Sequence, residues 1–295
     1  MQLLSSQMAI SINNANLYAS LEEKVEERTE ALAVKNAELA EKNKDITDSI
    51  RYAKRIQEAI LPPPSVIKKY LPNSFVFSKP KDIVSGDFYW VEHKVDNVLF
   101  AAVDCTGHGV PGAFMSIVGY DILGQALTET DSVSPAQLLD RLNRGVSETL
   151  KQASDDIKVR DGMDVALCML NFKTLELQFA GAYNPLFVVR GKELIEIKGD
   201  SLAIGSYTER HHQNYTNNIL QLQKNDTIYI FSDGYSDQFG GPEGKKFKIN
   251  QFKTMLLSMN GVEIDKQKEL LEKSIESWRG ALQQVDDMLV IGVRV

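Results

Sequence analysis

Apolar residues recur at two different spacings along the chain, and the change between them divides it into two parts. Residues 1–60 contain no glycine or proline and are rich in Ala, Glu, Lys, Leu and Asn, which predicts one long helix. Pro62, Pro63 and Pro64 end it, because proline lacks an amide donor and clashes with the preceding turn. We therefore predict a helical linker over residues 1–61 and a second domain over residues 65–295.

The predicted linker helix carries a partial heptad repeat. One column of residues spaced by seven is apolar, but the second, companion column that a coiled coil needs is mostly polar. A parallel dimer built on this helix would therefore have one good seam and one weak seam whose register shifts easily. A solvated helix lying on its own domain is the alternative interpretation. The apolar column consists of Val25, Leu32, Leu39, Ile46, Ala53 and Ile60, and the companion column of Arg28, Lys35, Lys42, Ser49 and Ile56.

The second part alternates short β-rich segments with helical patterns. Helices are expected over residues 112–128, 135–153 and about 265–281, the second opened by Ser134 with Gln137 in the capping-box position. Connections such as NFKT and RGK are too short for crossovers, so neighbouring strands pair antiparallel in an α+β layered domain. The predicted strands are residues 75–78, 87–91, 97–103, 164–170, 174–180, 186–190, 193–197, 216–222, 227–231 and 287–295.

Composition narrows the class of protein. The 295 residues are 43% hydrophobic and 25% charged, as in ordinary soluble domains, and the longest apolar runs are far shorter than the roughly 18 residues that span a bilayer. We find no secretory signal, and a net charge of −7 argues against a nucleic-acid surface. Cys105 and Cys168 lie in strand-like runs, which favours free thiols in a reducing cytoplasm.

Aspartates stand at the ends of several predicted strands. Asp104 and Asp233 follow strands, while Asp87 and Asp286 stand where strands begin. In an antiparallel sheet these ends lie side by side, so the four carboxylates would gather at one edge and repel one another unless cations lay between them. Hard oxygen ligands suit two Mg²⁺ or Mn²⁺ ions. For any single aspartate a turn is the simpler explanation, but the four together favour a metal centre.

At these residues the sequence resembles a known family, the metal-dependent (PPM, type 2C) protein phosphatases. The similarity is to the bacterial branch of sporulation-protein-E-like and sigma-regulator (SpoIIE/RsbU-like) serine phosphatases. The segments that carry it occur in the family's order between residues 75 and 295. They are VSGDFYW, AVDCTGHGVPGAFMS, AGAYNPLFVVR, FSDGYSD and QVDDMLVIGVRV.

The resemblance implies an antiparallel double β-sheet sandwich flanked by helices, with a two-metal centre at one end. It places the metal ligands at Asp87, Asp104, the backbone carbonyl of Cys105, Asp233 and Asp286, with Asp104 bridging both ions. The implied reaction is hydrolysis of phosphoserine or phosphothreonine by an activated water, without a covalent intermediate. The implied substrate is a small phosphorylated regulatory protein, an anti-sigma antagonist of the STAS type.

Other residues near these motifs have less certain roles. His108 either protonates the leaving serine oxygen or caps its loop. Lys81 either steers the phosphate or is a solvated surface lysine, and Asp164 either binds a third, weak metal or caps its strand. We interpret Asp237 and Asp287 as turn residues or as supports of the ligands.

The N-terminal segment SQMAISINNANLYASLEEKVEERTEAL resembles the last helix of a GAF-type sensor domain running into a signalling linker. We therefore expect a homodimer whose linker controls the phosphatase. A phosphatase-like interaction module without activity is the main alternative. A nucleotide cyclase or a histidine kinase has less support, since no base-selecting Lys and Asp arrangement is evident and residues 1–92 contain no histidine.

Overall fold

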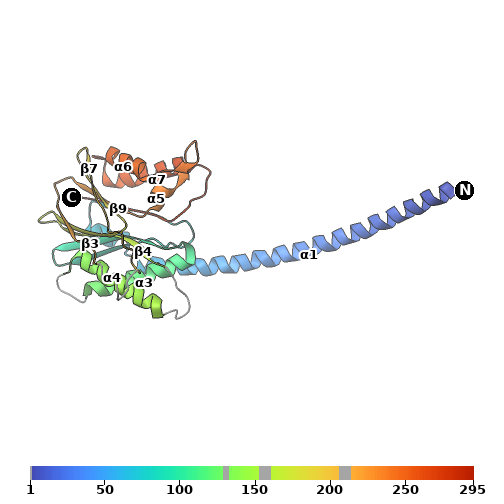
Figure 1. The fold of residues 1–295 in the computed structure, drawn as a ribbon, viewed down its shortest axis with the longest axis horizontal. Coiled ribbons are helices and arrows are strands. Elements are labelled where there is room, and N and C mark those ends of the chain that lie inside the picture. Colours follow the sequence, from blue (N-terminus) through green and yellow to red (C-terminus); the bar gives the residue numbers. More distant parts are fainter. Residues whose placement is uncertain (1, 129–132, 153–160, 206–213) are drawn as a thin grey trace. The chain divides into compact units, whose positions relative to one another are not determined.

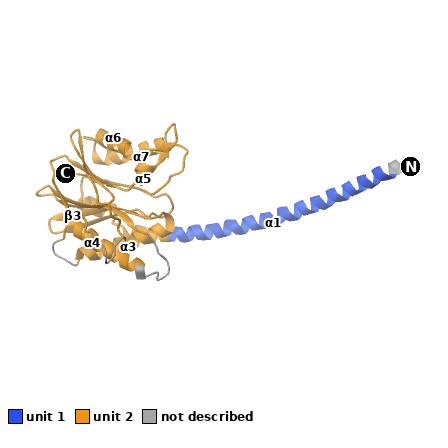
Figure 2. Ribbon diagram, viewed as in Figure 1, with its two compact units in different colours: residues 1–52 blue, residues 53–295 orange. Residues whose placement is uncertain are grey.

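The computed structural model describes residues 2–128, 133–152, 161–205 and 214–295. The chain forms two compact units, residues 1–52 and residues 53–295 (Figure 2). Helix α1 (Gln2–Ile60) supplies all of the described first unit and begins the second, which confirms the predicted long helix. No described helix combines the length and the apolar character that crossing a membrane requires.

The second unit contains two five-stranded antiparallel sheets (Figure 1). One sheet has the order β1-β12-β9-β6-β7, with bounds Ser74–Lys79, Met288–Arg294, Thr227–Phe231, Leu186–Arg190 and Glu193–Ile197. The other has the order β2-β3-β4-β5-β8, with bounds Phe88–Lys94, Asn97–Cys105, Met163–Asn171, Glu176–Ala182 and Asn218–Gln221. A small hairpin joins β10 (Phe239–Gly240) to β11 (Lys245–Lys246).

Helices cover the outer faces of both sheets. In Figure 1, α3 and α4 lie along the sheet that contains β3 and β4, whereas α6 and α7 lie on the opposite side of the sandwich. The helices of this unit after α1 are α2 (Pro64–Tyr70), α3 (Gly109–Thr128), α4 (Pro135–Gln152), α5 (Gly234–Asp237), α6 (Ile249–Ser258) and α7 (Ile264–Arg279). Residue 153, the last of the helix predicted over 135–153, lies outside the described residues.

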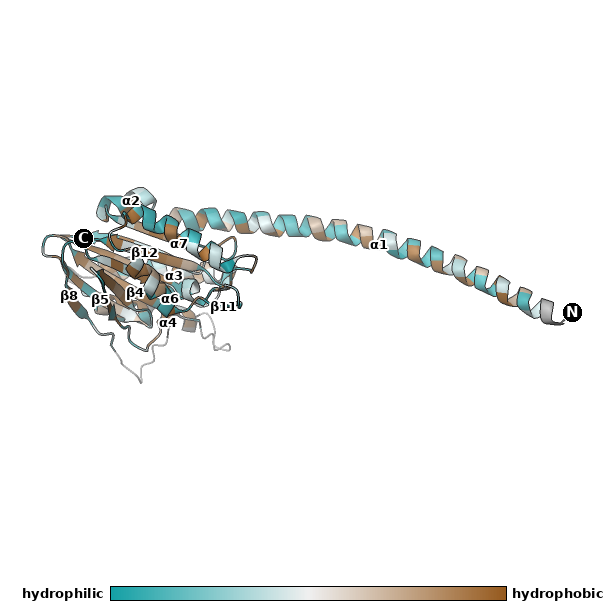
Figure 3. Cartoon of the chain, turned by 90° about the horizontal axis from the view of Figure 1, so that it is seen from above, coloured by the Kyte–Doolittle hydropathy of each residue, from teal (hydrophilic) through white to brown (hydrophobic). Residues whose placement is uncertain are grey.

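Alternation along each central strand explains the layers. In β3, Phe100 and Ala102 pack between the two sheets, whereas Leu99, Ala101 and Val103 pack under α3 and α4. Because both faces of such a strand are buried, its sequence is almost continuously apolar, and the strands of the sandwich are largely brown in Figure 3. A third apolar cluster joins the other sheet to α6 and α7, so three apolar layers fix the sandwich and the positions of its strand ends.

Candidate metal centre

The predicted aspartates of one sheet lie side by side in a row at the ends of its adjacent strands. Phe88 pairs with Val103, so Asp87 lies just beyond β2 beside the end of β3. Asp104 pairs directly with Asp164 of β4. Antiparallel register thus brings together side chains up to 77 positions apart in the sequence, as the alternation of strands predicts.

The second sheet contributes its aspartates to the same end. Asp233 follows β9, and Asp286 precedes the neighbouring strand β12, whose Val290 pairs with Phe231. The backbone N–H of Asp233 faces Oδ2 of Asp104 at a donor–acceptor distance of 3.4 Å, which links the two sheets. The structure therefore places all four strand-end aspartates of the sequence analysis at one end of the sandwich.

Burial and mutual repulsion change the acidity of these carboxyl groups. Burial, and then the charge of Asp233, raises the pKa of Asp104 to about 8. Burial, and then Asp104, raises the pKa of Asp87 well above its ordinary value. The pKa of Asp164 is raised to about 6 by burial and by Asp233. Charged carboxylates are thus unfavourable here without cations, as in many functional sites.

The donor set fits hard divalent cations in its chemistry. Oδ2 of the buried Asp87 has no hydrogen-bond partner, an arrangement that a metal ion would satisfy. Within the described part of the chain, no group of three or more His, Cys, Asp and Glu side chains is arranged as a finished ligand set. The acids are therefore neighbours that raise one another's pKa, and closure around an ion requires side-chain movements.

Cys105 fits its predicted role through its backbone alone. Its side chain is buried, and burial followed by the charge of Asp87 raises the pKa of the thiol well above its ordinary value, so the protonated thiol is an unsuitable ligand. A carbonyl ligand is indifferent to the side chain. Cys105 and Cys168 are both free and buried.

One aspartate that sequence reasoning assigned only a supporting or turn role holds the loop before Asp87. Oδ1 of Asp287 accepts a hydrogen bond from the backbone N–H of Lys81 at 2.6 Å, and its Oδ2 accepts one from Gly86 at 2.7 Å. One carboxylate thereby fixes both ends of the loop of residues 81–86. The predicted alternative for Lys81, a phosphate-steering side chain, is not tested by this backbone contact.

Gly86 is required at its position by close packing. A Cβ there would lie 2.5 Å from the carbonyl oxygen of Gly107 and 3.4 Å from that of Cys105. Both neighbours are backbone, so they cannot swing away as a flexible side chain would. The segment that carries Asp87 and the segment that follows Asp104 can therefore pack together only through glycine.

His108 is paired with an acid that the sequence analysis did not single out. Its Nδ1 lies 2.6 Å from Oδ2 of Asp82, and both side chains are half exposed. The contact orients the imidazole and leaves Nε2 for another partner. Asp82 stands five residues before Asp87 without any motif, so no sequence signal marked it.

Gln57, at the end of α1, also contacts this region. Its side chain is buried, and its Nε2 donates to the carbonyl of Ser85 at 2.6 Å and to Oγ of Ser116 at 2.9 Å. The N–H of Ser85 donates in return to Oε1 of Gln57 at 3.2 Å. Ser85 precedes Gly86 and Asp87, so the last turn of α1 is hydrogen-bonded to the segment that presents a predicted metal ligand.

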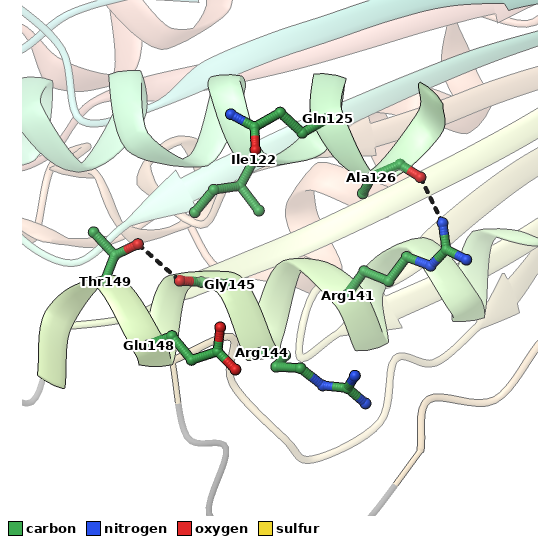
Figure 4. Close-up of a pocket in the computed structure, with 8 residues that line it drawn as sticks. All are labelled: Ile122, Gln125, Ala126, Arg141, Arg144, Gly145, Glu148 and Thr149. Atoms are coloured by element: carbon green, nitrogen blue, oxygen red, sulfur yellow. Dashed lines mark hydrogen bonds between the residues drawn. The ribbon is translucent and has the colours of Figure 1, made fainter. Parts of the chain in front are cut away.

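Two described cavities lie apart from the acidic end. One, of about 390 Å³, is a groove between α3 and α4 in which Nη1 of Arg141 donates to the carbonyl of Ala126 at 2.8 Å (Figure 4). The other, of about 280 Å³, lies beside α2 and β1 and is lined in part by Ile67 and Tyr89. None of the predicted site residues lines either cavity, so neither competes with the acidic end as the catalytic centre.

An antiparallel sandwich with helices on both outer faces and a carboxylate cluster at one end defines a PP2C-type phosphatase domain. A family model described as stage II sporulation protein E (SpoIIE) matches residues 94–295. The solved SiaA-PP2C domain of Pseudomonas aeruginosa is 32% identical, with a TM-score of 0.78 over 86% of this chain and 98% of that chain. The chain belongs to the SpoIIE family, which confirms the resemblance and the predicted fold.

More distant structures share the fold alone. The phosphatase domain of SpoIIE from Bacillus subtilis, solved with a fragment of its regulatory domain, is 21% identical with a TM-score of 0.59, covering 75% of this chain and 61% of that one. The RsbU and RsbW domains of Rv1364c from Mycobacterium tuberculosis give 17% identity and a TM-score of 0.58, covering 76% of this chain and 60% of that one. Among curated protein sequences, none matches this chain significantly.

Proposed function

We propose that this chain is a metal-dependent protein serine/threonine phosphatase that uses two Mn²⁺ or Mg²⁺ ions. The observation that carries the proposal is the meeting of Asp87, Asp104, Asp233 and Asp286 from both sheets, with one carboxylate oxygen buried and unpartnered. A purely structural strand end has no reason to collect acids that raise one another's pKa.

The four aspartates and the carbonyl of Cys105 would hold the ions, with Asp104 shared between them. When bound, such ions lower the pKa of a water molecule and offset the charge of the phosphoryl oxygens. In the hydrolysis a water molecule would add to phosphorus and lose a proton to solvent, the bond between phosphorus and the serine oxygen would break, and inorganic phosphate would leave. His108, oriented by Asp82 at 2.6 Å, would give a proton to the departing serine oxygen.

The proposal is tested by hydrolysis of p-nitrophenyl phosphate with Mn²⁺, with and without chelator. We expect metal-dependent turnover that Asp104→Asn and Asp233→Asn each lower by about 10³-fold, equivalent to about 4 kcal/mol of transition-state stabilisation. Turnover that persists in chelator would contradict the assignment. Asp226→Asn, at the other end of β9, is the matched control for loss of an aspartate.

The proposed substrate is a small phosphorylated regulatory protein, an anti-sigma antagonist of the STAS type, as membership of this branch suggests. A phosphatase-like interaction module remains the second candidate, because catalytic competence rests on residues whose roles are proposals. Capture of phosphorylated small proteins by the Asp104→Asn variant, compared with the wild type, separates the two. An inactive module would retain the phosphorylated partner equally well in the wild type and in the variant. An enzyme would retain it only in the variant, because the active wild type would dephosphorylate and release it.

We further infer that α1 forms a homodimer that regulates the phosphatase. The apolar column is exposed in the single chain, with Val25 at 62%, Leu32 at 63% and Leu39 at 57%, which is typical of a helix that lacks its partner. The hydrogen bonds from Gln57 to Ser85 and Ser116 give the end of the same helix a route to the segment before Asp87.

Charge substitutions in the column test this regulation in the full chain. Leu32→Lys combined with Leu39→Lys should yield monomers in sedimentation and change the specific activity. The matched control is Lys35→Glu combined with Lys42→Glu in the polar companion column, which should stay dimeric. Equal specific activity in monomer and dimer would contradict the regulatory role.

A further inference from the structure

Five described residues other than glycine have a positive φ, and one of them lies at the acidic end of the sandwich. Tyr183 has a φ of +57° and follows β5, where Val165 pairs with Ala182. Val95, in the turn between β2 and β3, has a φ of +56° and lies at the opposite end of the same sheet. A left-handed backbone is unfavourable for a side chain with a Cβ, so each position needs a reason.

Packing does not supply that reason for Tyr183. Its side chain is 52% exposed and belongs to none of the three apolar clusters. The backbone conformation is held locally, since the N–H of Tyr183 donates to the carbonyl of Asp200 at 2.9 Å and the N–H of Asn184 donates to that of Ala182 at 2.7 Å. The fold therefore maintains a strained turn that displays a large aromatic side chain to solvent.

The register places the backbone of Tyr183 in line with the acids of this sheet. Asp104 pairs with Asp164, and Tyr183 is the next position beyond the pair of Val165 with Ala182. Neighbouring strands are about 4.8 Å apart, so the backbone of Tyr183 lies about 10 Å from that of Asp104. An extended peptide advances about 3.3 Å per residue, so a residue about three positions from a phosphoserine at the acids would reach this tyrosine.

We propose that Tyr183 contacts the polypeptide that flanks the phosphorylated residue and thereby favours protein substrates over small phosphate esters. The inference rests on the proposed phosphatase function. An exposed aromatic side chain provides a large apolar contact surface and loses little conformational entropy on binding, and a small ester bound at the acids does not extend to it. Tyr183 is thus a specificity residue, distinct from the groups that carry out hydrolysis.

The test compares Tyr183→Gly with Val95→Gly, two replacements at exposed positions with nearly the same φ. Glycine adopts a positive φ without steric strain, so neither variant should lower the melting temperature. The substrates are phosphorylated casein and p-nitrophenyl phosphate, both with Mn²⁺. We expect Tyr183→Gly to lower the ratio of the two kcat/KM values by about tenfold, mainly through the KM for casein, and Val95→Gly to leave it unchanged.

Each other outcome overturns the inference. An equal fall for both substrates would make Tyr183 part of the metal centre, and an unchanged ratio would exclude the contact. A wild-type KM for phosphorylated casein no lower than that for p-nitrophenyl phosphate would show that flanking polypeptide is not bound. Failure of the proposed function is distinguishable, because the wild type would then hydrolyse neither substrate.

Discussion

An aspartate stands at each end of strand β9, and the two are surrounded by opposite charges. Asp226 precedes the strand and is 2% exposed, yet Arg190 donates to it through Nε at 3.0 Å and through Nη2 at 2.6 Å. Asp233 follows the strand among other acids, and burial, Asp237 and Asp286 raise its pKa. At one end the fold supplies a cation, and at the other it gathers carboxylates.

This difference separates a structural acid from a candidate functional one. A buried charge is tolerated when a partner and hydrogen bonds compensate it, as at Asp226, where the N–H of Gln223 also donates at 2.9 Å. Uncompensated acids lower stability, and such a loss is expected where a site must receive a cation. The prediction that follows is that the two ends respond differently to pH, metal and mutation.

The largest expected effect is the pH dependence of the metal-free protein. The pKa of Asp104 in the folded state is raised to about 8, so this group stabilises the fold fully below its unfolded pKa near 4. That contribution is lost as the pH rises through about 8, because the folded chain binds more protons than the unfolded chain in this window. Calorimetry in chelator should show a melting temperature that falls from pH 5 to pH 8.

Metal and mutation should remove this dependence. Mn²⁺ should raise the melting temperature more at pH 8 than at pH 5, since ligation requires the deprotonated acids. Asp104→Asn cannot ionise, so its metal-free profile should be flatter than that of the wild type. A metal-free melting temperature that rises between pH 5 and pH 8 would contradict the electrostatic account of the acidic end.

The next effect concerns the compensated end. Arg190→Met removes the cation and leaves Asp226 buried and charged, so we expect a loss of about 3–5 kcal/mol in the free energy of unfolding by urea. The double variant Arg190→Met with Asp226→Leu should recover most of that loss. Equal stability of the single variant and the wild type would mean that Asp226 does not depend on Arg190.

Most of the sheet architecture was predictable from the sequence for a physical reason. Strands buried on both faces are almost continuously apolar and are bounded by turn residues, so their positions and the antiparallel pairing of neighbours joined by short connections follow from the pattern. The capping box is also confirmed, since Ser134 N–H donates to Gln137 Oε1 at 2.9 Å and Gln137 N–H donates to Ser134 Oγ at 3.3 Å. These features depend on neighbours in the sequence.

Features set by tertiary contacts were missed. The prediction started α3 at residue 112, but it begins at Gly109, because packing against the segment of Gly86 overrides the low helix propensity of its first residues. Helix α2 begins with Pro64, the last of the prolines that predicted a break, since proline is tolerated in the first turn. Helix α6 (Ile249–Ser258) was not predicted either.

The candidate site shows the same division. The strand-end aspartates were predicted to meet, and the register brings them to one end of the sandwich. The contacts of Asp287 with Lys81, of Asp82 with His108 and of Gln57 with Ser85 span 206, 26 and 28 positions. No periodicity or motif marks a partner at such a distance, so only the folded chain reveals the groups that hold the loop.

A smaller effect at the acidic end should follow from loosening that loop. Asp287→Asn keeps the size of the side chain but replaces one acceptor oxygen by an amide group, so one of the hydrogen bonds to Lys81 and Gly86 is lost. We expect the free energy of unfolding to fall by about 2 kcal/mol. We also expect the Mn²⁺ concentration that gives half-maximal hydrolysis of p-nitrophenyl phosphate to rise 10–100-fold. Asp96→Asn, whose acid pairs with Lys173 at 2.7 Å in the turn between β2 and β3, is a matched control away from the site. Unchanged metal dependence in Asp287→Asn would mean that the loop does not position Asp87.

The smallest effect should come from Asp164, whose pKa is raised less than that of Asp104. Its pKa is raised to about 6 by burial and by Asp233, so its contribution to the stability of the metal-free protein is lost as the pH rises through about 6. Asp164→Asn should therefore flatten the melting profile only between about pH 4 and 6, and leave the fall toward pH 8 that Asp104 causes. The double variant with Asp104→Asn would test whether the two contributions add, because paired neighbours in one cluster generally do not. If Asp164→Asn instead abolished the fall toward pH 8, the acids would titrate as one coupled group, and the row would have to be treated as a single site.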